Sequence, residues 1–417
     1  LIKRENPLPA ICGRVCNRRC EDACTRGRVD AAVAIDEVKK FIAQRDLDAA
    51  TRYVPPVVTP TRAGGFDQKI AIIGAGPAGL SCAFYLAEKG YKPVVFEKNE
   101  RPGGMLTYGI PSFKLQKDVI EAEVEVIRLM GAEFRYGVEV GRDVTLDELR
   151  AQGFKAFYVA IGCQGGRPAG IPGEDAEDVT VAVDFLREVN SGHVDALPGR
   201  TIVVGGGNVA IDVARNACRL GSEHVEMFCL ESEAQMPASE EERREAIEDG
   251  AHISCGWGPK EVHLDEAGRV CGITFKRCTR VMDDEGRFAP EYDENDLRRV
   301  DADRVVMSIG QSIVWGDLLA GSKVELGRGQ GALADPQTYQ TAEPDIFVGG
   351  DVYTGPSFAI DAIAAGHEAA VSIHRFVQPG STLTIGRNQR HYTALDRDDA
   401  VIESYDNASR EVARVDR

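Results

Sequence analysis

The stretch IAIIGAGPAGLSCAFYLAEKGYKPVVFEK, residues 70–98, decides the fold. A run of β-branched residues leads into three glycines, Gly74, Gly76 and Gly79, and then into an apolar helical pattern. Gly74 permits a tight turn, Gly76 lets a pyrophosphate approach the backbone, and Gly79 lets helix and strand pack closely. Glu97 ends the next strand, at the distance where an acidic side chain binds a ribose 2′-hydroxyl. This pattern predicts a dinucleotide site with its pyrophosphate at a helix N-terminus.

The same pattern returns in VVGGGNVAIDVARNACRLGSEHVEMFCLESE, residues 203–233. Gly205 and Gly207 are followed by Ala210 in the third position, which is a permitted variant. The next strand ends at Glu231, which accepts hydrogen bonds from both free ribose hydroxyls and repels a 2′-phosphate, and no arginine follows closely. The second site is therefore expected to favour NAD(H) over NADP(H). The alternative is that Glu231 is only a solvated carboxylate at a strand end.

Four of the 11 cysteines lie together near the start of the chain, in CGRVCNRRCEDAC: Cys12, Cys16, Cys20 and Cys24. Such clustering indicates a metal site rather than a disulfide framework. The C-x3-C-x3-C-x3-C spacing differs from the C-x2-C pairs of structural zinc sites, so iron–sulfur is the better expectation. In one continuous helix Cys12 and Cys24 would be about 18 Å apart, too far to hold one cluster. The chain must therefore bend, or the ligands must divide.

Length and charge limit the function further. A chain of 417 residues with 43% hydrophobic content predicts two or three domains. Its formal net charge of -17 repels phosphate backbones and anionic lipids, so neither nucleic acid nor a membrane is an expected partner. No apolar run approaches the ~20 residues of a spanning helix and no secretion signal opens the chain, which predicts a cytoplasmic protein without membrane insertion. Because the sequence begins at Leu1, we expect a processed chain or a fragment.

Four further motifs can be compared with known families: EKNERPGGMLTYGIPSFKL (97–115), GGGNVAID (205–212), MPASEEE (236–242) and GGDVYTGPSFAIDAIAAGHEAA (349–370). Together they resemble the motifs of the glutamate synthase small-subunit family, and the resemblance runs from about Asn6 to about Phe376. This family comprises FAD and iron–sulfur proteins that oxidise NAD(P)H, and it supplies modules to dihydropyrimidine dehydrogenase and to electron-bifurcating transhydrogenases.

The chain departs from that family in two places. Many NADPH-using members carry paired arginines where this chain has Leu230 and Glu231, and the earlier cysteine-rich half of the family domain is absent. The resemblance implies one [4Fe-4S] cluster held mainly by Cys16, Cys20 and Cys24, with Cys12 the weakest candidate. The alternative is that these cysteines are free thiols whose cluster was lost with the upstream half.

The resemblance also implies how FAD is held. Residues 104–106 would lie along the flavin, 160–162 would cross near it, and Gly350 with Asp351 would hold the ribityl and pyrophosphate region. Phe358 and Ala359 would approach the flavin ring, and Lys114 either touches the flavin or faces solvent. The residues expected to contact FAD or the nicotinamide dinucleotide are Gly74, Gly76, Pro77, Ala78, Gly79, Glu97, Lys98, Gly104, Met105, Leu106, Lys114, Val140, Ala160, Ile161, Gly162, Gly205, Gly207, Asn208, Val209, Ala210, Glu231, Gly310, Gly350, Asp351, Phe358 and Ala359.

The expected fold class is α/β, with two Rossmann-like domains and a small helical iron–sulfur segment. DIFVGGD (345–351) resembles the return strand of a flavin domain, so the FAD-binding domain is expected to be discontinuous and the NAD-binding domain inserted in it. Val33, Ile35, Val38, Phe41 and Ile42 recur at helical spacing and predict a helix after a cysteine-bearing loop, in a small separate unit. The expected units are a partial iron–sulfur helical domain (1–50), a linker (51–68), the FAD-binding domain (69–180 and 316–376), the NAD-binding domain (181–315) and a C-terminal tail (377–417).

These features predict an FAD-dependent NAD(P)H oxidoreductase, with NADH favoured. Hydride transfer between nicotinamide and flavin needs no side-chain acid or base, so no catalytic residue is predicted. The expected role is an electron-transfer subunit that exchanges electrons among NAD(H), FAD and the iron–sulfur or other metal centres of a partner protein, in a hetero-oligomer. One alternative is a glutamate synthase small subunit that uses NADPH. A thioredoxin-reductase-type enzyme is disfavoured because the second domain has no C-x2-C pair, and a non-catalytic FAD scaffold because both glycine turns are intact.

Overall fold

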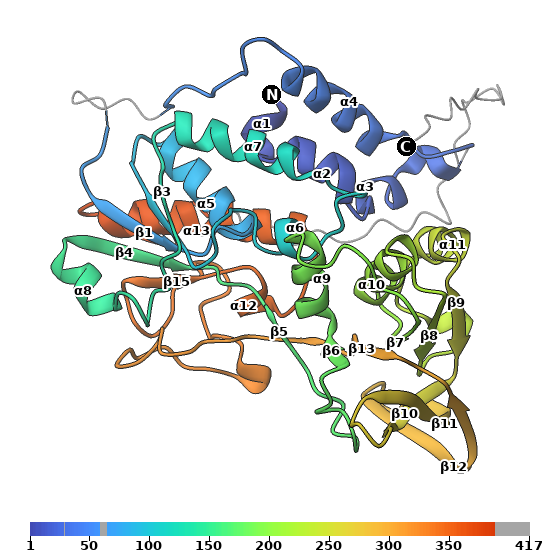
Figure 1. Ribbon diagram of the computed structural model, residues 1–417. Helices are drawn as coiled ribbons and strands as arrows, with labels where there is room; N and C mark the ends of the chain where they lie inside the picture. The colour runs from blue at the N-terminus through green and yellow to red at the C-terminus, as the bar shows by residue number, and fades with distance from the viewer. Residues whose placement is uncertain (29, 59–64, 388–417) are drawn as a thin grey trace.

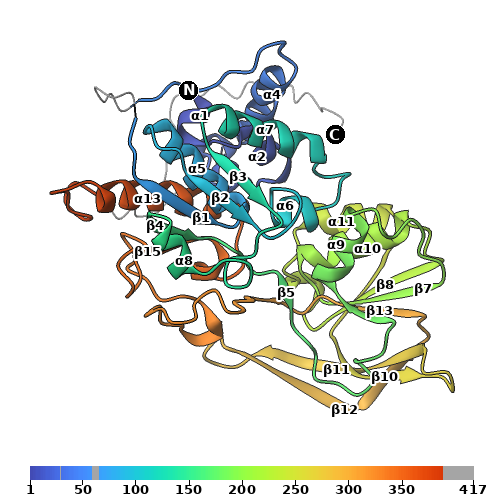
Figure 2. The ribbon, with the colours of Figure 1, turned by 60° about the vertical axis from the view of Figure 1, so that its left-hand side comes forward.

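The computed structural model describes residues 1–28, 30–58 and 65–387. Figures 1 and 2 show a helical N-terminal segment lying over one sheet domain, with a second sheet domain beside it. The first sheet has five parallel strands in the order β15-β4-β1-β2-β3. Its strands are β1 (Lys69–Ile73), β2 (Val94–Glu97), β3 (Glu133–Tyr136), β4 (Phe154–Val159) and β15 (Ile346–Val348).

The last strand of this sheet comes from a distant part of the chain. β15 pairs with β4, with Phe347 opposite Tyr158, although a whole second domain separates them in sequence. This pairing confirms that the first domain is discontinuous and that the second is inserted in it. The long helix α13 (Ala359–Val377) packs on α5 (Pro77–Glu88) to form one core with the sheet. The other helices of this domain are α6 (Met105–Tyr108), α7 (Lys117–Leu129), α8 (Leu146–Ala151) and α12 (Asp351–Thr354).

The second sheet repeats this design, with five parallel strands in the order β6-β13-β7-β8-β9. An antiparallel three-stranded sheet, β10-β11-β12, extends from it at the lower right of Figure 1. The strands are β6 (Val179–Val181), β7 (Arg200–Val204), β8 (His224–Cys229), β9 (His252–Cys255), β10 (Trp257–Leu264), β11 (Val270–Met282), β12 (Phe288–Val300) and β13 (Arg304–Met307), and the helices are α9 (Ala182–Asn190), α10 (Asn208–Arg219) and α11 (Glu240–Glu248).

Two chain crossings join the domains. β5 (Gly165–Gly166) and β14 (Gln311–Ser312) pair with each other where the chain enters and leaves the second domain. The predicted boundary between residues 180 and 181 is wrong, because β6 already belongs to the second sheet. A three-residue strand is too short for its periodicity to show which sheet it joins.

The N-terminal segment is not the loop and separate unit that its sequence predicts. Its first half is helical, and Leu8, Ile11 and Cys12 are buried in the core of the first domain. Cys-containing helix α2 also lies against α7. This segment is therefore packed as part of the flavin-type domain. Its helices are α1 (Ile2–Glu5), α2 (Pro9–Val15), α3 (Arg19–Asp22) and α4 (Ile35–Leu47), with a 3-10 turn at Thr25–Arg28.

Helix α4 confirms the predicted helix, but its apolar side chains face outward. Val38, Phe41 and Ile42 are 53%, 60% and 48% exposed, and Val33 and Ile35 are exposed as well. The buried positions on this helix are Asp36 and Ala43. Helical spacing located the element, but it did not indicate which neighbour covers the apolar stripe.

A buried carboxyl group lies where this segment meets the first domain. Glu123 on α7 is 1% exposed, and its Oε1 lies 3.7 Å from Arg52 Nη2. Burial raises the pKa of Glu123 to about 7. The native state therefore keeps the proton up to about pH 7, whereas the unfolded chain loses it near the ordinary glutamate pKa of 4.5.

Glu123 is expected to make stability depend on pH in a defined direction. The stabilising contribution of neutral Glu123 to the free energy of unfolding is complete below the pKa of the unfolded chain. It is lost as the pH rises toward 7, a change of about 3 kcal/mol at most. The Glu123→Gln side chain stays neutral at every pH. The melting temperature of this variant should therefore rise relative to that of wild type between pH 5 and pH 8. Glu125→Gln, an exposed change on the same helix, is the control, and an equal response of both variants would contradict the expectation.

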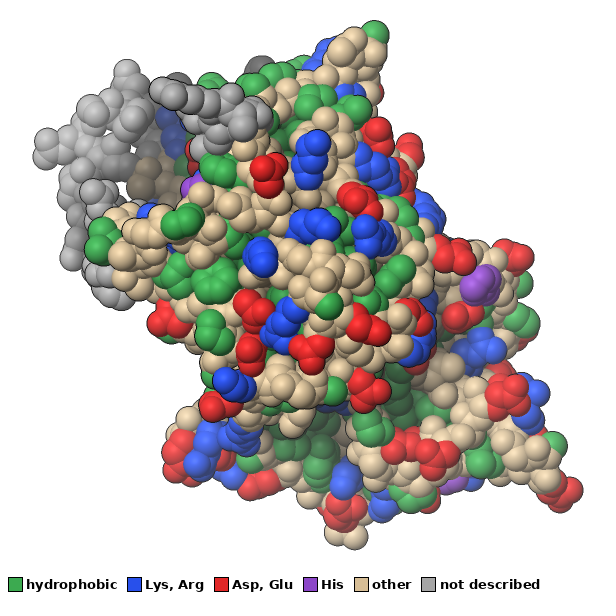
Figure 3. Space-filling view, turned by 90° about the vertical axis from the view of Figure 1, so that its left-hand side faces the viewer, with side chains coloured by type: hydrophobic (Ala, Val, Ile, Leu, Met, Phe, Trp, Pro, Cys, Tyr) green, Lys and Arg blue, Asp and Glu red, His purple; other side chains and the backbone are tan. Residues whose placement is uncertain are grey.

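Within the described part of the chain, no helix is both long and apolar enough to cross a bilayer. Figure 3 shows basic and acidic side chains interspersed over one face of the molecule, without a broad basic patch there.

Candidate cofactor site

A cavity of about 720 Å³ lies between the two sheet domains and the N-terminal segment. The first glycine turn forms one wall. Gly74 has a φ of +104°, and a Cβ there would lie 2.5 Å from the Ala160 carbonyl oxygen. A Cβ on Gly79 would lie 2.0 Å from the Gly74 carbonyl oxygen, whereas a Cβ on Gly76 would meet nothing within 4 Å. Two glycines thus allow close backbone packing, and Gly76 leaves an open cradle at the N-terminus of α5 that fits a pyrophosphate.

Glu97 lies beside this turn and is 3% exposed. Its Oε2 accepts a hydrogen bond from Ala75 N at 2.8 Å, and its Oε1 accepts from Asn99 N at 2.9 Å. These bonds fix the carboxylate at the end of β2, facing the cavity. The arrangement fits the acidic residue that binds a ribose hydroxyl in dinucleotide sites.

The opposite wall comes from the end of β15 and the start of α13. Gly350 has a φ of +68°, and the Asp351 side chain accepts a hydrogen bond from Ser357 N at 3.2 Å. Burial raises the pKa of Asp351 to about 6. The predicted residues that line the cavity are Gly74, Gly76, Pro77, Ala78, Glu97, Lys98, Gly104, Met105, Leu106, Lys114, Val140, Ala160, Ile161, Gly162, Asn208, Val209, Gly350, Asp351, Phe358 and Ala359.

Six predicted residues do not line this cavity: Gly79, Gly205, Gly207, Ala210, Glu231 and Gly310. Gly79 and Ala210 are buried in helix packing. A Cβ on Gly205 would lie 2.2 Å from the Ser308 carbonyl oxygen, so Gly205 shapes the second turn as Gly74 shapes the first. Gly310 lies at the returning crossover next to Arg167.

Glu231 lies beside the second turn, just beyond β8. A Cβ on Gly206 would lie 3.1 Å from Glu231 Oε2, and the Glu231 carbonyl oxygen accepts from Gly256 N at 2.9 Å. Sequence reasoning found no arginine close behind Glu231, but β11 places Arg277 and Arg280 in a small surface cavity with Ser232. The sequence did not indicate these arginines, because they lie far from Glu231 along the chain and only the folding of β11 brings them to this position.

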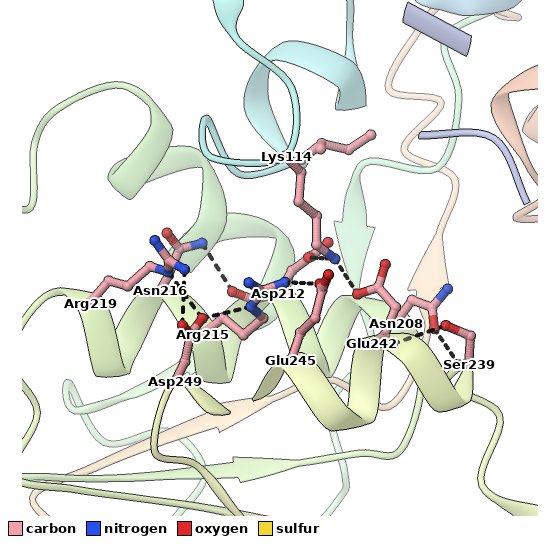
Figure 4. Close-up of polar contacts among 12 residues, drawn as sticks. Lys114, Asn208, Asp212, Arg215, Asn216, Arg219, Ser239, Glu242, Glu245 and Asp249 are labelled. Carbon is pink, nitrogen blue, oxygen red and sulfur yellow. Dashed lines mark hydrogen bonds and ion pairs between the residues drawn. The ribbon is translucent and has the colours of Figure 1, made fainter. Parts of the chain in front are cut away.

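Lys114 lines the cavity, but its side chain is paired with carboxylates of the second domain. Its Nζ lies 2.5 Å from Asp212 Oδ1 and also binds the Glu242 carboxylate, so it joins the first domain to α10 and α11 (Figure 4). Burial lowers the pKa of Lys114, but the two carboxylates outweigh burial and the pKa is raised overall. Burial raises the pKa of Asp212 to about 6, and Lys114 opposes that rise. The lysine is therefore the cation of a largely buried interdomain ion cluster.

Polar contacts continue from this cluster to the second glycine turn. The Ser239 hydroxyl accepts from Glu242 N at 3.3 Å, and Ser239 N donates to Asn208 Oδ1 at 3.1 Å (Figure 4). Phe113, next to Lys114, lies under the Arg219 guanidinium, 4.2 Å from ring centroid to Cζ. Sequence reasoning missed Ser239, Glu242 and Asp212 as site residues, although the MPASEEE and GGGNVAID motifs contain them.

The four N-terminal cysteines are not gathered into a ligand set. Cys12 is 1% exposed beside Leu8 and Ile11, and burial raises its pKa to about 11. Cys16 lines the cofactor cavity, whereas Cys20 is exposed. Across the described residues, no three His, Cys, Asp or Glu side chains converge as a metal site. The cavity thus fits a dinucleotide, and the four cysteines do not converge on one point in the described part of the chain.

Two Rossmann-like domains that share one cavity define a flavin- and nicotinamide-type oxidoreductase. A family described as pyridine nucleotide-disulphide oxidoreductase matches residues 68–366, and one described as dihydropyrimidine dehydrogenase domain II, 4Fe-4S cluster, matches residues 1–51. The chain belongs to the first family, in its branch of FAD and iron–sulfur proteins that includes the glutamate synthase small chain.

Its relatives are subunits of several redox enzymes. The chain is 35% identical to the beta subunit of NADP(+)-dependent formate dehydrogenase of Moorella thermoacetica, over 92% of this chain and 56% of that protein. It is 35% identical to the NADPH glutamate synthase small chain of Escherichia coli K12, over 91% and 82%. It is 33% identical to PreT, a subunit of NAD-dependent dihydropyrimidine dehydrogenase of the same strain, over 90% and 84%. The chain therefore spans little more than half of the formate dehydrogenase subunit.

Solved structures share the fold. FprA of Mycobacterium tuberculosis superposes with a TM-score of 0.64, covering 74% of this chain and 84% of that one. Thioredoxin reductase of Lactococcus lactis superposes with a TM-score of 0.57, covering 74% and 99%. Both are 19% identical to this chain, so they establish the fold alone.

Proposed function

We propose that this chain exchanges hydride between NAD(H) and FAD and passes the electrons to or from the redox centres of a partner protein, as the electron-transfer subunit of a hetero-oligomer. One observation carries this proposal: Gly76 of the first turn and Asn208 of the second line the same cavity. A dinucleotide on each turn would therefore have its reactive end in a shared space.

The side chains that line this cavity would bind and orient the two dinucleotides. FAD supplies the hydride acceptor when bound, and this chemistry requires no acid or base from the protein. The first turn offers the N-terminus of α5 to a pyrophosphate, and Glu97 offers its carboxylate to a ribose. Phe358 and Leu106 add apolar surface that excludes water from the reacting rings.

The N-terminal segment supports an electron route through this face. Cys16 and Arg18 line the cavity together with the flavin-turn residues. Arg19 binds Asp361 at the start of α13 through two hydrogen bonds, of 3.0 and 3.2 Å, and its Cζ lies 5.0 Å from the Phe358 ring centroid. A partner's redox centre that docks beside this segment would approach the flavin edge closely.

Glu231 is proposed to favour NADH. This proposal is supported by the position of the Glu231 carboxylate beside Gly206, because a carboxylate at such a strand end accepts hydrogen bonds from free ribose hydroxyls and repels a 2′-phosphate. Glu231→Gln is expected to weaken NADH binding by about tenfold and to narrow the preference over NADPH. Anaerobic titrations of flavin absorbance with each nucleotide measure both effects. Glu266→Gln, at an exposed glutamate that lines neither cavity, should leave both titrations unchanged.

Use of NADPH is the second candidate, because Arg277 and Ser232 line a cavity at the same strand end. Arginine beside a ribose site accommodates a 2′-phosphate. If NADPH bleaches the flavin at lower concentration than NADH, Arg277 rather than Glu231 determines specificity.

The proposal is tested with the purified FAD-loaded chain. We expect NADH to bleach the flavin and dyes to accept the electrons, with no glutamate formed from glutamine and 2-oxoglutarate. Glutamate formation by the chain alone would replace the subunit role with that of a complete synthase. A flavin that neither nucleotide reduces would make the second site vestigial and overturn the proposal.

A further inference from the structure

We propose that Cys229 and Cys255 form a reversible disulfide that weakens nicotinamide dinucleotide binding at the second glycine turn. The effect on nucleotide binding rests on the proposed function, whereas formation of the disulfide depends only on the two thiols. The two cysteines are 26 residues apart, so no C-x2-C pattern announces them.

The geometry of the pair is set by the sheet. Cys229 ends β8 and Cys255 ends β9, and the two residues are direct partners in the parallel ladder. Their Sγ atoms lie 3.7 Å apart as free thiols. Neighbouring strands are about 4.8 Å apart, within the Cα separations that disulfides span. Because both residues stand at strand ends, the closure of about 1.7 Å that a disulfide requires falls on adjoining turns rather than on the sheet interior.

The two thiols differ in access, which sets the order of reaction. Cys229 is 3% exposed, and burial raises its pKa. Cys255 is half-buried and lines the surface cavity that also contains Arg277 and Ser232. The Arg277 guanidinium lies close to Gly256, the residue after Cys255. Cys255 is therefore the thiol that reacts with an oxidant from solvent, and Cys229 is the thiol that resolves the product.

The oxidant is a peroxide. The Cys255 thiolate attacks hydrogen peroxide, its sulfur is oxidised to a sulfenic acid, and with one added proton a water leaves. The Cys229 thiol then attacks the sulfenic sulfur, the S–S bond forms, and a second water leaves. Two thiols have lost two electrons and one peroxide has gained them. A dithiol reverses the bond by exchange.

The disulfide would act on the nucleotide through the turn that it touches. A Cβ on Gly206 would lie 2.8 Å from Cys229 Cβ and 3.1 Å from Glu231 Oε2, so the glycine turn, the cysteine and the ribose-binding carboxylate are packed together. Cys229 Sγ donates to the Glu231 carbonyl oxygen at 3.7 Å, and that oxygen also accepts from Gly256 N. Drawing the sulfurs together removes the Cys229 contact and moves the Glu231 backbone.

The test uses the FAD-loaded full chain, with hydrogen peroxide as the oxidant and catalase to stop the reaction. Non-reducing peptide mapping should find a 229–255 cross-link in wild type and in Cys271→Ser, a half-buried control on β11, but not in Cys255→Ser or Cys229→Ser. Calorimetric binding of NAD+, which does not reduce the oxidised flavin, should weaken by about fivefold or more on oxidation of the two cross-linked proteins and recover with dithiothreitol.

Two results would overturn the proposal: absence of the 229–255 cross-link, or a cross-linked wild type that binds NAD+ as tightly as the protein without the cross-link. Failure of the proposed function appears separately, because a chain whose flavin NADH does not bleach can still be mapped for the cross-link.

Discussion

Lys114→Ala is expected to slow reduction of the flavin by saturating NADH at least about tenfold, which is about 1.4 kcal/mol of transition-state free energy. The lysine is the cation between Asp212 and Glu242, and removing it leaves these two carboxylates of the second domain next to each other without a cation at a largely buried interface. Breaking a buried ion cluster by removing one partner is strongly unfavourable, so the second domain is expected to shift. Small shifts between reacting rings cost large factors in rate.

The expected signature is a loss of rate without a matching loss of affinity. Glu231, Gly205 and Gly207 do not line the cavity that Lys114 lines, so the Kd for NADH should change by less than about threefold. Stopped-flow reduction over a range of NADH concentrations separates the two quantities. Lys114→Arg should recover part of the rate, and Lys155→Ala, at an exposed lysine on β4, is the control. An increase in Kd with an unchanged limiting rate would contradict a positioning role.

The parts of the site that sequence predicted are those fixed by local backbone chemistry. Gly74 and Gly205 must adopt positive φ, and each is packed against a carbonyl oxygen of a neighbouring strand end. Such requirements depend on residues within one strand, turn and helix, so a short sequence motif indicates them. The return strand β15 was predictable for the same reason, because its motif resembles that of a flavin domain.

The parts that sequence missed depend on how distant segments meet. Lys114 is paired by residues about 100 or more positions away, and Arg277 reaches Ser232 only because β11 folds back beside β8. The apolar stripe of α4 predicted a helix correctly, yet its periodicity is the same whether a neighbour covers the stripe or not. The cysteine spacing indicated a metal site, but Cys12 is turned into the core by the packing of α2.

Adding a side chain to each of the two glycine turns is expected to abolish a different function, FAD binding at the first turn and reduction by NADH at the second. A Cβ on Gly76 or on Gly207 meets no protein atom within 4 Å, and both residues have negative φ, -76° and -90°. Valine at either position is therefore accommodated by the fold but occupies the space where a pyrophosphate approaches the backbone.

Gly76→Val should fold and lose FAD, whereas Gly207→Val should retain FAD and no longer be reduced by NADH. Flavin content, circular dichroism and reduction by NADH and by dithionite measure these outcomes on one preparation. Dithionite should still bleach the Gly207→Val protein, because its flavin site is intact. Loss of FAD from both variants would show that the two turns are not separate sites, and NADH reduction of Gly207→Val would remove the second turn from the electron path.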